Sequence, residues 1–277
     1  MHTRNAAYAA LLAAGLSLAP LGHADAQTQT ATKPFEPQVG QQGKDVVWVP
    51  TPQATVDKML DMAKVGPQDY VMDLGSGDGR TVITAAKRGA TAMGIEYNPD
   101  MVELSKRNAA EAGVTAKATF VKADLFETDL SKATVVTMFL LPQINLKLRP
   151  KILDLKPGTR VASNTFTMDD WEPDQEAQVQ GEGCTSWCTA LFWVVPAKVE
   201  GTWKLGAGEL VLEQQFQKLT GTLRAGGAPV PITAAKMNGE EIAFSVGSTQ
   251  YTGRVNGSTM QGKTLAGESW SATRAGK

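Results

Sequence analysis

The sequence predicts an α/β protein with a doubly wound, mostly parallel sheet, followed by a small antiparallel all-β domain. Apolar strand-like segments at about 69–74, 91–96, 117–121, 133–139 and 159–163 alternate with helical stretches at about 79–88, 99–112 and 142–155. Such alternation is typical of a parallel sheet that binds its ligand at the carboxyl ends of the strands. Beyond residue 200 the pattern changes to short alternating strands separated by tight turns. We therefore place an α/β domain at residues 45–199 and a β domain at 200–277.

The first residues have the composition of a secretory signal peptide. Arg4 precedes an apolar run from Ala6 to Leu21, and Ala24-Asp25-Ala26 offers a cleavage site of the A-x-A type. We expect residues 1–26 to be removed and the protein to be periplasmic or secreted. The run is short for a membrane span, so no stable membrane insertion is expected after cleavage, and an uncleaved anchor is the alternative.

The segment before the first strand divides into two parts. Residues 27–44 are rich in Gln, Thr, Pro and Gly and are expected to form a disordered lead-in. Thr51 is then predicted to cap a helix that has Pro52 at its first position. The apolar stripe of this helix consists of Val56, Met59, Leu60 and Ala63.

The segment Val71–Arg80 reads Val-Met-Asp-Leu-Gly-Ser-Gly-Asp-Gly-Arg, an apolar strand followed by a glycine-rich loop. Such a loop lets a ligand lie directly against the backbone. The dinucleotide fingerprint of Rossmann-like folds has the spacing G-x-G-x-x-G instead. Asp73 and Asp78 would repel a pyrophosphate, whereas they would attract the ammonium and sulfonium groups of S-adenosylmethionine. The candidate cofactor-binding residues here are Asp73, Gly75, Gly77 and Gly79.

Carboxylates also end the next two predicted strands. Glu96, followed by Tyr97, lies at the distance where an acidic residue contacts the ribose hydroxyls in related folds. Asp124 can accept a hydrogen bond from an adenine amino group while the N–H of Leu125 donates to the ring. The alternative is that Glu96 and Asp124 are ordinary turn or cap residues. Carboxylates at the ends of three successive strands favour the cofactor interpretation.

The methyl acceptor is expected beside the end of the fourth strand, where the sequence reads Phe139-Leu-Leu-Pro142. Methyltransferases that act on nucleic-acid amines often carry an Asn/Asp-Pro-Pro-aromatic motif there, and this chain lacks it. The acceptor-side candidates are Phe139, Pro142 and Asn145, although Phe139 and Leu141 also fit core positions. Tyr97 or Trp48 could hold an alkylammonium by cation–π contact. Proton removal from an amine would fall to solvent or to a carboxylate such as Asp169 or Asp170.

The cysteines and histidines restrict the chemistry further. Cys184 and Cys188 are the two cysteines, and in an oxidising compartment a disulfide is the first interpretation, with reduced core thiols or a redox pair as alternatives. Both histidines, His2 and His23, lie in the predicted signal peptide. A mature chain without histidine excludes Ser-His-Asp and Cys-His mechanisms and His-ligated metal sites, and no metal is expected.

The remainder of the chain predicts strands. Thr189–Val195 and a return at Gly201–Leu205 could form a closing hairpin of the first sheet. In the β domain, Asn238-Gly239 and Asn256-Gly257 are strong hairpin turns. Trp203 and Trp270, near its two ends, suggest paired terminal strands with both rings in the core, and an aromatic ligand-binding face is the alternative. The formal net charge of −1 gives no electrostatic sign of nucleic-acid binding.

Several of these segments together resemble a known family. Val49–Pro52, Asp73–Arg80, Gly94–Pro99 and Thr134–Pro150 are similar to class I methyltransferases related to the mitochondrial lysine methyltransferases of the ATP synthase c subunit and the adenine nucleotide translocase, including exported bacterial relatives. The resemblance covers about residues 45–170. It implies an S-adenosylmethionine cofactor, with Thr51 near its methionine end, and a protein lysine or small amine as acceptor.

The expected function is therefore S-adenosylmethionine-dependent methylation of a protein lysine or another amine, with no nucleic-acid partner. One conflict is that this cofactor is made in the cytoplasm, whereas the leader predicts export. An exported protein that binds S-adenosylmethionine or a nucleoside without catalysis, and docks a partner through its β domain, is the alternative. A dinucleotide oxidoreductase is disfavoured by the acidic loop.

Overall fold

The computed structural model describes residues 35–181 and 183–276. The predicted signal peptide and residues 27–34 of the predicted lead-in lie outside this range. The helices are α1 (Gln53–Met62), α2 (Arg80–Lys87), α3 (Pro99–Glu111) and α4 (Pro142–Leu153). None of the helices in the described part of the chain has the length and apolar character that crossing a bilayer requires.

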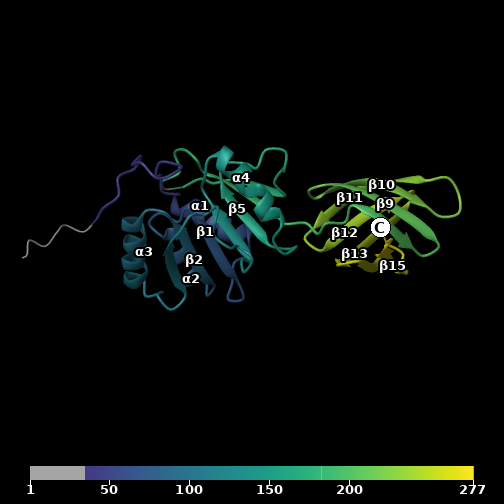
Figure 1. Ribbon diagram of the computed structural model, residues 1–277, viewed down its shortest axis with the longest axis horizontal. Coiled ribbons are helices and arrows are strands. Elements are labelled where there is room, and N and C mark those ends of the chain that lie inside the picture. The colour runs from purple at the N-terminus through teal and green to yellow at the C-terminus, as the bar shows by residue number, and fades with distance from the viewer. Residues whose placement is uncertain (1–34, 182, 277) are drawn as a thin grey trace, which may run out of the picture. The chain divides into compact units, whose positions relative to one another are not determined.

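The α/β domain is built on a seven-stranded sheet with the order β3-β2-β1-β4-β5-β7-β6 (Figure 1). Its strands are β1 (Tyr70–Leu74), β2 (Thr91–Glu96), β3 (Ala118–Lys122), β4 (Val135–Met138), β5 (Arg160–Asn164), β6 (Gln175–Gln178) and β7 (Thr189–Val194). The first five strands are parallel, as the alternation of strands and helices predicts. From β1 the chain first adds β2 and β3 on one side of the sheet and then β4 and β5 on the other. Such a switch point places a ligand crevice beside the carboxyl end of β1.

Helices cover both faces of this sheet. Apolar side chains of α1, α2 and α3, such as Leu60, Val82 and Val102, pack in one cluster against Val71 and Val135. On the opposite face α4 packs in a second cluster. Each helix therefore buries one stripe, and the carboxyl ends of the parallel strands stay free for a site.

Local sequence signals explain where the helices begin. Asn98 caps α3 as predicted, because its side chain accepts a hydrogen bond of 2.9 Å from the Asp100 N–H and Pro99 follows at the first position. The prediction for α1 was wrong in detail: Pro52, not Thr51, is the N-cap residue, and no side chain caps this helix. Thr51 is thereby left outside the helix, where it lines a pocket.

The partner of β7 differs from the predicted closing hairpin. β7 pairs antiparallel with β5 on one side and with β6 on the other. The segment Gly201–Leu205 is instead β8, the first strand of the barrel. The polar, acidic composition of Gln175–Gln178 concealed an edge strand, because such a strand is half exposed and needs no apolar alternation.

The β domain is a closed antiparallel barrel with the order β10-β11-β12-β13-β14-β15-β8-β9. Its strands are β8 (Gly201–Leu205), β9 (Gly208–Gln215), β10 (Lys218–Arg224), β11 (Val230–Asn238), β12 (Glu241–Val246), β13 (Thr249–Asn256), β14 (Thr259–Thr264) and β15 (Ser269–Arg274). The terminal strands pair as the two tryptophan segments predict, with Arg274 opposite Trp203. Closure removes the exposed sheet edges that would otherwise favour aggregation.

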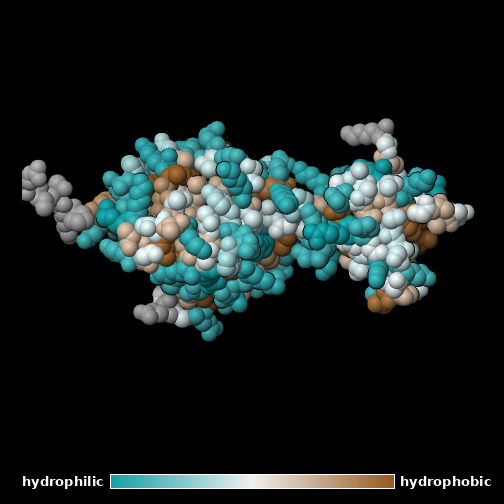
Figure 2. Space-filling model, turned by 90° about the horizontal axis from the view of Figure 1, so that it is seen from below, coloured by the Kyte–Doolittle hydropathy of each residue, from teal (hydrophilic) through white to brown (hydrophobic). Residues whose placement is uncertain are grey.

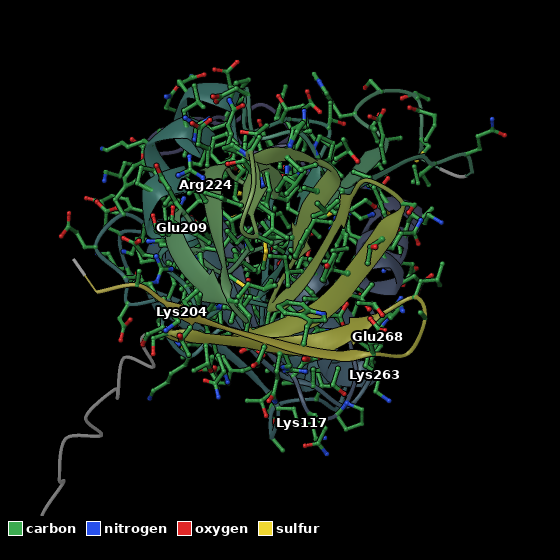
Figure 3. The ribbon with its side chains drawn as sticks, turned by 90° about the vertical axis from the view of Figure 1, so that its right-hand side faces the viewer. Lys117, Lys204, Glu209, Arg224, Lys263 and Glu268 are labelled. Atoms are coloured by element: carbon green, nitrogen blue, oxygen red, sulfur yellow. The ribbon has the colours of Figure 1, made fainter. Side chains whose placement is uncertain are left out.

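Aromatic side chains fill the barrel. Trp203 and Phe244 are buried, and Trp270 meets the Phe244 ring edge-on at 5.9 Å. The core interpretation of Trp203 and Trp270 is thus confirmed over the ligand-binding one. Figure 3 shows charged residues of both signs at the strand ends of the barrel, among them Lys204, Glu209, Arg224, Lys263 and Glu268.

Candidate functional site

A pocket lies at the carboxyl ends of β1, β2, β3 and β4 and gathers most of the predicted site residues. Those that line it are Thr51, Asp73, Gly75, Gly77, Glu96, Tyr97, Asp124, Leu125 and Phe139. Gly79, Pro142 and Asn145 are not among the lining residues. The cofactor half of the prediction therefore converges on one place, and the acceptor half does so only in part.

The glycine loop owes its shape to left-handed backbone conformations. Gly75 and Gly77 have φ values of 74° and 55°, and the N–H groups of Gly75 and Ser76 both donate to the Ile95 carbonyl. A Cβ atom on Gly77 would lie 2.7 Å from Nε1 of Trp48. The loop after β1 is thus hydrogen-bonded to β2. Because glycine has no side chain, the loop backbone at Gly75 and Gly77 can line the pocket directly.

Gly79, which was predicted to bind the cofactor, has a packing role in the structure and does not line the pocket. It is the N-cap residue of α2 with φ 83°, and a Cβ atom there would lie 2.8 Å from the Phe120 ring and 2.9 Å from Ser105. The last glycine of the loop therefore lets α2 begin close to β3 and α3.

Glu96 connects the glycine loop to the start of α3. One carboxylate oxygen accepts from the Gly77 N–H at 2.9 Å, and the other accepts from the Asn98 N–H at 2.9 Å. The carboxylate is thus oriented by backbone donors on both sides. It lies in the pocket wall at the end of β2, where the sequence placed a ribose contact.

Asp73 is a buried carboxylate at the end of β1. Thr137 of β4 donates a hydrogen bond of 2.6 Å to it. Burial, reinforced by the negative charges of Asp78 and Glu96, raises the pKa of Asp73 to about 7. A cation placed beside it would reverse this penalty, because an opposite charge favours the ionised form.

Arg80 is a site residue that the sequence did not single out. Its guanidinium pairs with Asp78 at 2.6 Å and donates to the Thr51 carbonyl at 2.8 Å. It therefore ties the loop to the segment before α1 and neutralises one of the loop carboxylates. In the sequence, the position of Arg80 at the end of the glycine motif was the one indication of a role in the site.

The predicted lead-in supplies part of the pocket wall, which corrects the expectation of disorder for its described residues 35–44. Within this segment the Gly40 N–H donates to the Trp48 carbonyl at 2.8 Å, and the Trp48 N–H donates to the Gln41 carbonyl at 2.9 Å. We call residues 41–50 the strap, since every one of them lines the pocket. The strap contains an internal backbone hydrogen bond between Trp48 and Gln41. A composition rich in Gln, Thr, Pro and Gly does not reveal such ordered structure.

Lys44 of the strap binds two predicted cofactor residues. Its ammonium forms an ion pair with Asp124 and lies 4.8 Å from the centre of the Tyr97 ring. The hydrogen bond from Lys44 lowers the pKa of Asp124. Asp124, which was expected to accept a hydrogen bond from an adenine amino group, is thus paired with Lys44. The Tyr97 ring, a candidate for binding an alkylammonium, also contacts the Lys44 ammonium.

Asp73, Glu96 and Ser76 offer polar groups in the pocket wall that fit S-adenosylmethionine. Among the described residues, Asp73 and Glu96 have no ion-pair partner, whereas Asp78 and Asp124 have one each. Ser76 Oγ in the same loop is buried without a hydrogen-bond partner in the described part of the chain. A ligand with cationic and hydroxyl groups would use these positions, while a pyrophosphate would face two unpaired carboxylates.

The acceptor-side candidates have different roles. Phe139 lines the pocket together with Leu140 and Ile144, so this wall is apolar. Pro142 starts α4. Asn145 is fully buried and donates to the carbonyls of Phe166 and Thr167, both at 3.1 Å. Asn145 therefore holds the loop after β5 in place behind the wall.

The candidate proton acceptors lie elsewhere. Asp170 forms an ion pair with Arg149 at 2.5 Å, and neither Asp169 nor Asp170 lines the pocket. No cluster of three or more metal-ligating His, Cys, Asp or Glu side chains occurs among residues 35–181 and 183–276.

Both cysteines are free thiols, so the predicted disulfide is not present in this structure. Cys184 lies 3.4 Å from the Thr55 hydroxyl of α1, and the Cys188 thiol donates to the Ser186 carbonyl at 3.3 Å. Each sulfur thus has its own hydrogen-bond partner, which matches the alternative of reduced core thiols for the buried Cys188, whereas Cys184 is only half-buried.

Comparison with known proteins agrees with this pocket. The ANTKMT methyltransferase domain family matches residues 73–175. A protein-lysine N-methyltransferase of Saccharolobus islandicus is 47% identical over 138 residues, which cover 49% of this chain and 86% of the relative. The Homo sapiens lysine N-methyltransferase that is named for the C subunit of ATP synthase is 37% identical over 137 residues, which cover 49% of this chain and 57% of the relative.

A solved structure supports the same conclusion. A Salinibacter ruber protein described as an RNA methyltransferase, crystallised with S-adenosylhomocysteine, is 46% identical with a TM-score of 0.51 and covers 55% of this chain and 96% of its own. These matches reach about half of the chain. With its intact glycine loop and strand-end carboxylates, the chain belongs to the S-adenosylmethionine-dependent methyltransferases that the ANTKMT methyltransferase domain describes.

Proposed function

We propose that this methyltransferase transfers a methyl group to the side-chain nitrogen of a protein lysine or to another amine. The observation that carries the proposal is the apolar wall of Phe139, Leu140 and Ile144 beside the cofactor half of the pocket. It offers no polar groups of the kind that hold a planar base amine. The two relatives named above as lysine N-methyltransferases support the same acceptor class.

The residues of the pocket perform three tasks in such a reaction. Asp73 and Glu96 would hold the cofactor, which when bound would supply a methyl group on a positively charged sulfur. Phe139 and its neighbours exclude water, and desolvation lowers the pKa of a lysine from its ordinary value of about 10.4. The neutral nitrogen forms the new C–N bond as the methyl–sulfur bond breaks, and its proton has left to solvent. Positioning in line carries most of the rate enhancement.

RNA is the acceptor class that the Salinibacter ruber structure brings into consideration. Acidic and basic side chains are nearly balanced in this chain, with 27 Lys and Arg against 28 Asp and Glu. The face shown in Figure 2 is mostly hydrophilic, with small scattered apolar groups. A protein that neutralises many phosphates would carry a basic stripe. This balance favours the amine of a protein over RNA.

One labelling experiment separates these acceptors. The purified full chain is incubated with methyl-tritiated S-adenosylmethionine and an extract of its own cells, divided into protease-treated, RNase-treated and untreated portions. We expect label in protein that acid hydrolysis releases as Nε-methylated lysine. Label that is lost with RNase, or that appears only on carboxyl or hydroxyl oxygens, would overturn the proposal. Cofactor binding without any transfer would favour the non-catalytic alternative.

We further propose that residues 1–26 direct export, on the composition of the leader alone. N-terminal sequencing of the protein recovered from its own cell envelope is expected to begin at Gln27. A chain that begins at Met1 in the cytoplasmic fraction would overturn this and would remove the conflict over cofactor supply.

A further inference from the structure

Three aromatic rings form a continuous wall that leads from the pocket to the surface. Phe139 lines the pocket. Its ring stacks on that of Phe166, with centroids 5.8 Å apart and planes 15° apart, and it meets the Trp187 ring at 6.4 Å. Phe139 and Phe166 are half-buried, whereas Trp187 is 47% exposed. Exposure thus increases outward along the wall.

The wall is assembled from three separate segments that are tied together. Phe166 is held through its carbonyl, which accepts from Ser163 Oγ at 2.8 Å and from the buried Asn145 amide at 3.1 Å. The Trp187 loop is held by the contact of Cys184 with Thr55 and by the Cys188 thiol bond to Ser186. Phe166 and the loop of Trp187 are therefore positioned by polar contacts of residues that do not line the pocket.

The backbone beside these rings is strained. Thr165, next to Phe166, has φ 62°, and Trp187 itself has φ 53°. A β-branched or bulky residue at positive φ is an outlier that persists only where the surroundings hold it. Thr165 and the strand after Trp187 hold each other, since the Thr165 N–H donates to the Thr189 carbonyl at 2.7 Å. Such strain is typical of ligand-binding segments.

An exposed indole next to a pocket is also unusual for a water-facing surface. Tyr97, 50% exposed, and Val47, 43% exposed, line the same pocket. Aromatic rings that run from a pocket to the surface suit a ligand with an aliphatic stem and a nitrogen at its tip, because rings attract ammonium groups and pack against methylenes.

We propose that Phe139, Phe166 and Trp187 receive the side chain of the acceptor lysine, and that Trp187 determines which amines are accepted. The inference rests on the proposed function and names its acceptor subsite. The four methylenes of lysine lie along the rings, with the nitrogen at Phe139. A ring at the solvent edge selects acceptors with a long stem, so short amines gain little from Trp187.

The test compares Trp187→Ala, Trp187→Phe and Phe166→Leu in the full chain. The probe is the peptide acetyl-Gly-Gly-Lys-Gly-Gly-amide, with methyl transfer followed by mass spectrometry. We expect Trp187→Ala to raise the KM for the peptide at least fivefold, with kcat and S-adenosylhomocysteine affinity within twofold, and Trp187→Phe to retain most of the wild-type KM. Leu265→Ala, an exposed apolar residue of the barrel, is the matched control and should change nothing.

A second readout does not need turnover. The chain is labelled with 5-fluorotryptophan, and the Trp187 resonance is identified by its absence in Trp187→Phe. We expect this resonance to shift when the peptide is added in the presence of S-adenosylhomocysteine, and not to shift with the same peptide carrying alanine in place of lysine.

The outcomes separate the two proposals. Methylation of the peptide with wild-type KM in Trp187→Ala and Phe166→Leu overturns the aromatic wall and leaves the proposed function standing. A shift of the Trp187 resonance without methylation of any lysine supports the wall and overturns the proposed function. Absence of both the shift and the methylation overturns both.

Discussion

The cofactor side and the acceptor side of this pocket are built by different means. On the cofactor side, carboxylates at strand ends line the pocket and are oriented by backbone N–H groups, as the Gly77 N–H orients Glu96. On the acceptor side, Phe139 contacts aromatic rings from two distant segments, stacking on Phe166 and meeting Trp187 at a tilt. Recognition through the backbone needs a local conformation and therefore leaves a motif. Recognition through packed side chains from distant segments leaves almost no sequence motif.

The largest effect is expected for a substitution that weakens cofactor binding alone. Glu96→Ala removes the acceptor of two backbone N–H groups together with the predicted ribose contact. Because charge-assisted bonds contribute about 1.5–3 kcal/mol, we expect S-adenosylhomocysteine affinity to fall about 10- to 100-fold by calorimetry. Asp170→Ala, whose carboxylate lies outside the pocket lining, is the control. Unchanged affinity in Glu96→Ala would remove Glu96 from the site.

The second prediction uses pH to sharpen the comparison. Since the pKa of Asp73 is raised to about 7, the site must lose a proton to bind the cationic cofactor. Affinity for S-adenosylmethionine should rise about tenfold per pH unit below 7 and level off above it. The acceptor side should behave differently: kcat should go on rising above pH 7, because only neutral lysine attacks.

Stability gives an independent check of the same group. A carboxyl group whose pKa is raised from 3.8 to about 7 by folding keeps its proton in the folded state while the unfolded chain has lost it. The free energy of unfolding should therefore fall as pH rises from about 4 to 7, and no further above it. Asp73→Asn should flatten both this dependence and that of cofactor affinity. A pH profile identical to the wild type would contradict the assignment.

The third prediction breaks the acceptor side alone. Phe139→Ala removes the ring that joins the pocket to Phe166 and Trp187. We expect the rate of methyl transfer to fall about tenfold or less by quench assay, since one lost positioning contact is worth about 1–1.5 kcal/mol. Affinity for S-adenosylhomocysteine should stay within twofold. Full activity in this variant would place the acceptor elsewhere.

The smallest effect concerns the strap. Lys44→Met removes the ion pair with Asp124 while it keeps an aliphatic stem. Because exposed ion pairs contribute little, we expect affinity for S-adenosylhomocysteine to change less than about fivefold, and to rise, as Asp124 becomes free to accept from the ligand. The salt dependence of binding should weaken at the same time. A fall in affinity would instead make Lys44 part of the binding site.

The sequence by itself determined the parallel strands, the glycine loop and the acidic strand ends. These features are local: Asn98 caps α3 through a neighbour two residues away, and the conformation of Gly77 is encoded by the residue itself. The antiparallel β domain and the pairing of its terminal strands also followed from periodicity and the placement of Trp203 and Trp270, whereas a partly closed barrel and a sandwich both remained open.

Only the tertiary structure decided the rest. Gln175–Gln178 became an edge strand because β7 offers free backbone groups, and the strap lines the pocket with its Lys44 paired to a carboxylate 80 residues away. Gly79 serves packing because Phe120 passes close to it. Phe139, Phe166 and Trp187 carry no common spacing, so their stacking follows from how β4, β5 and β7 lie side by side. Such contacts join residues distant in the chain, and no local pattern encodes them.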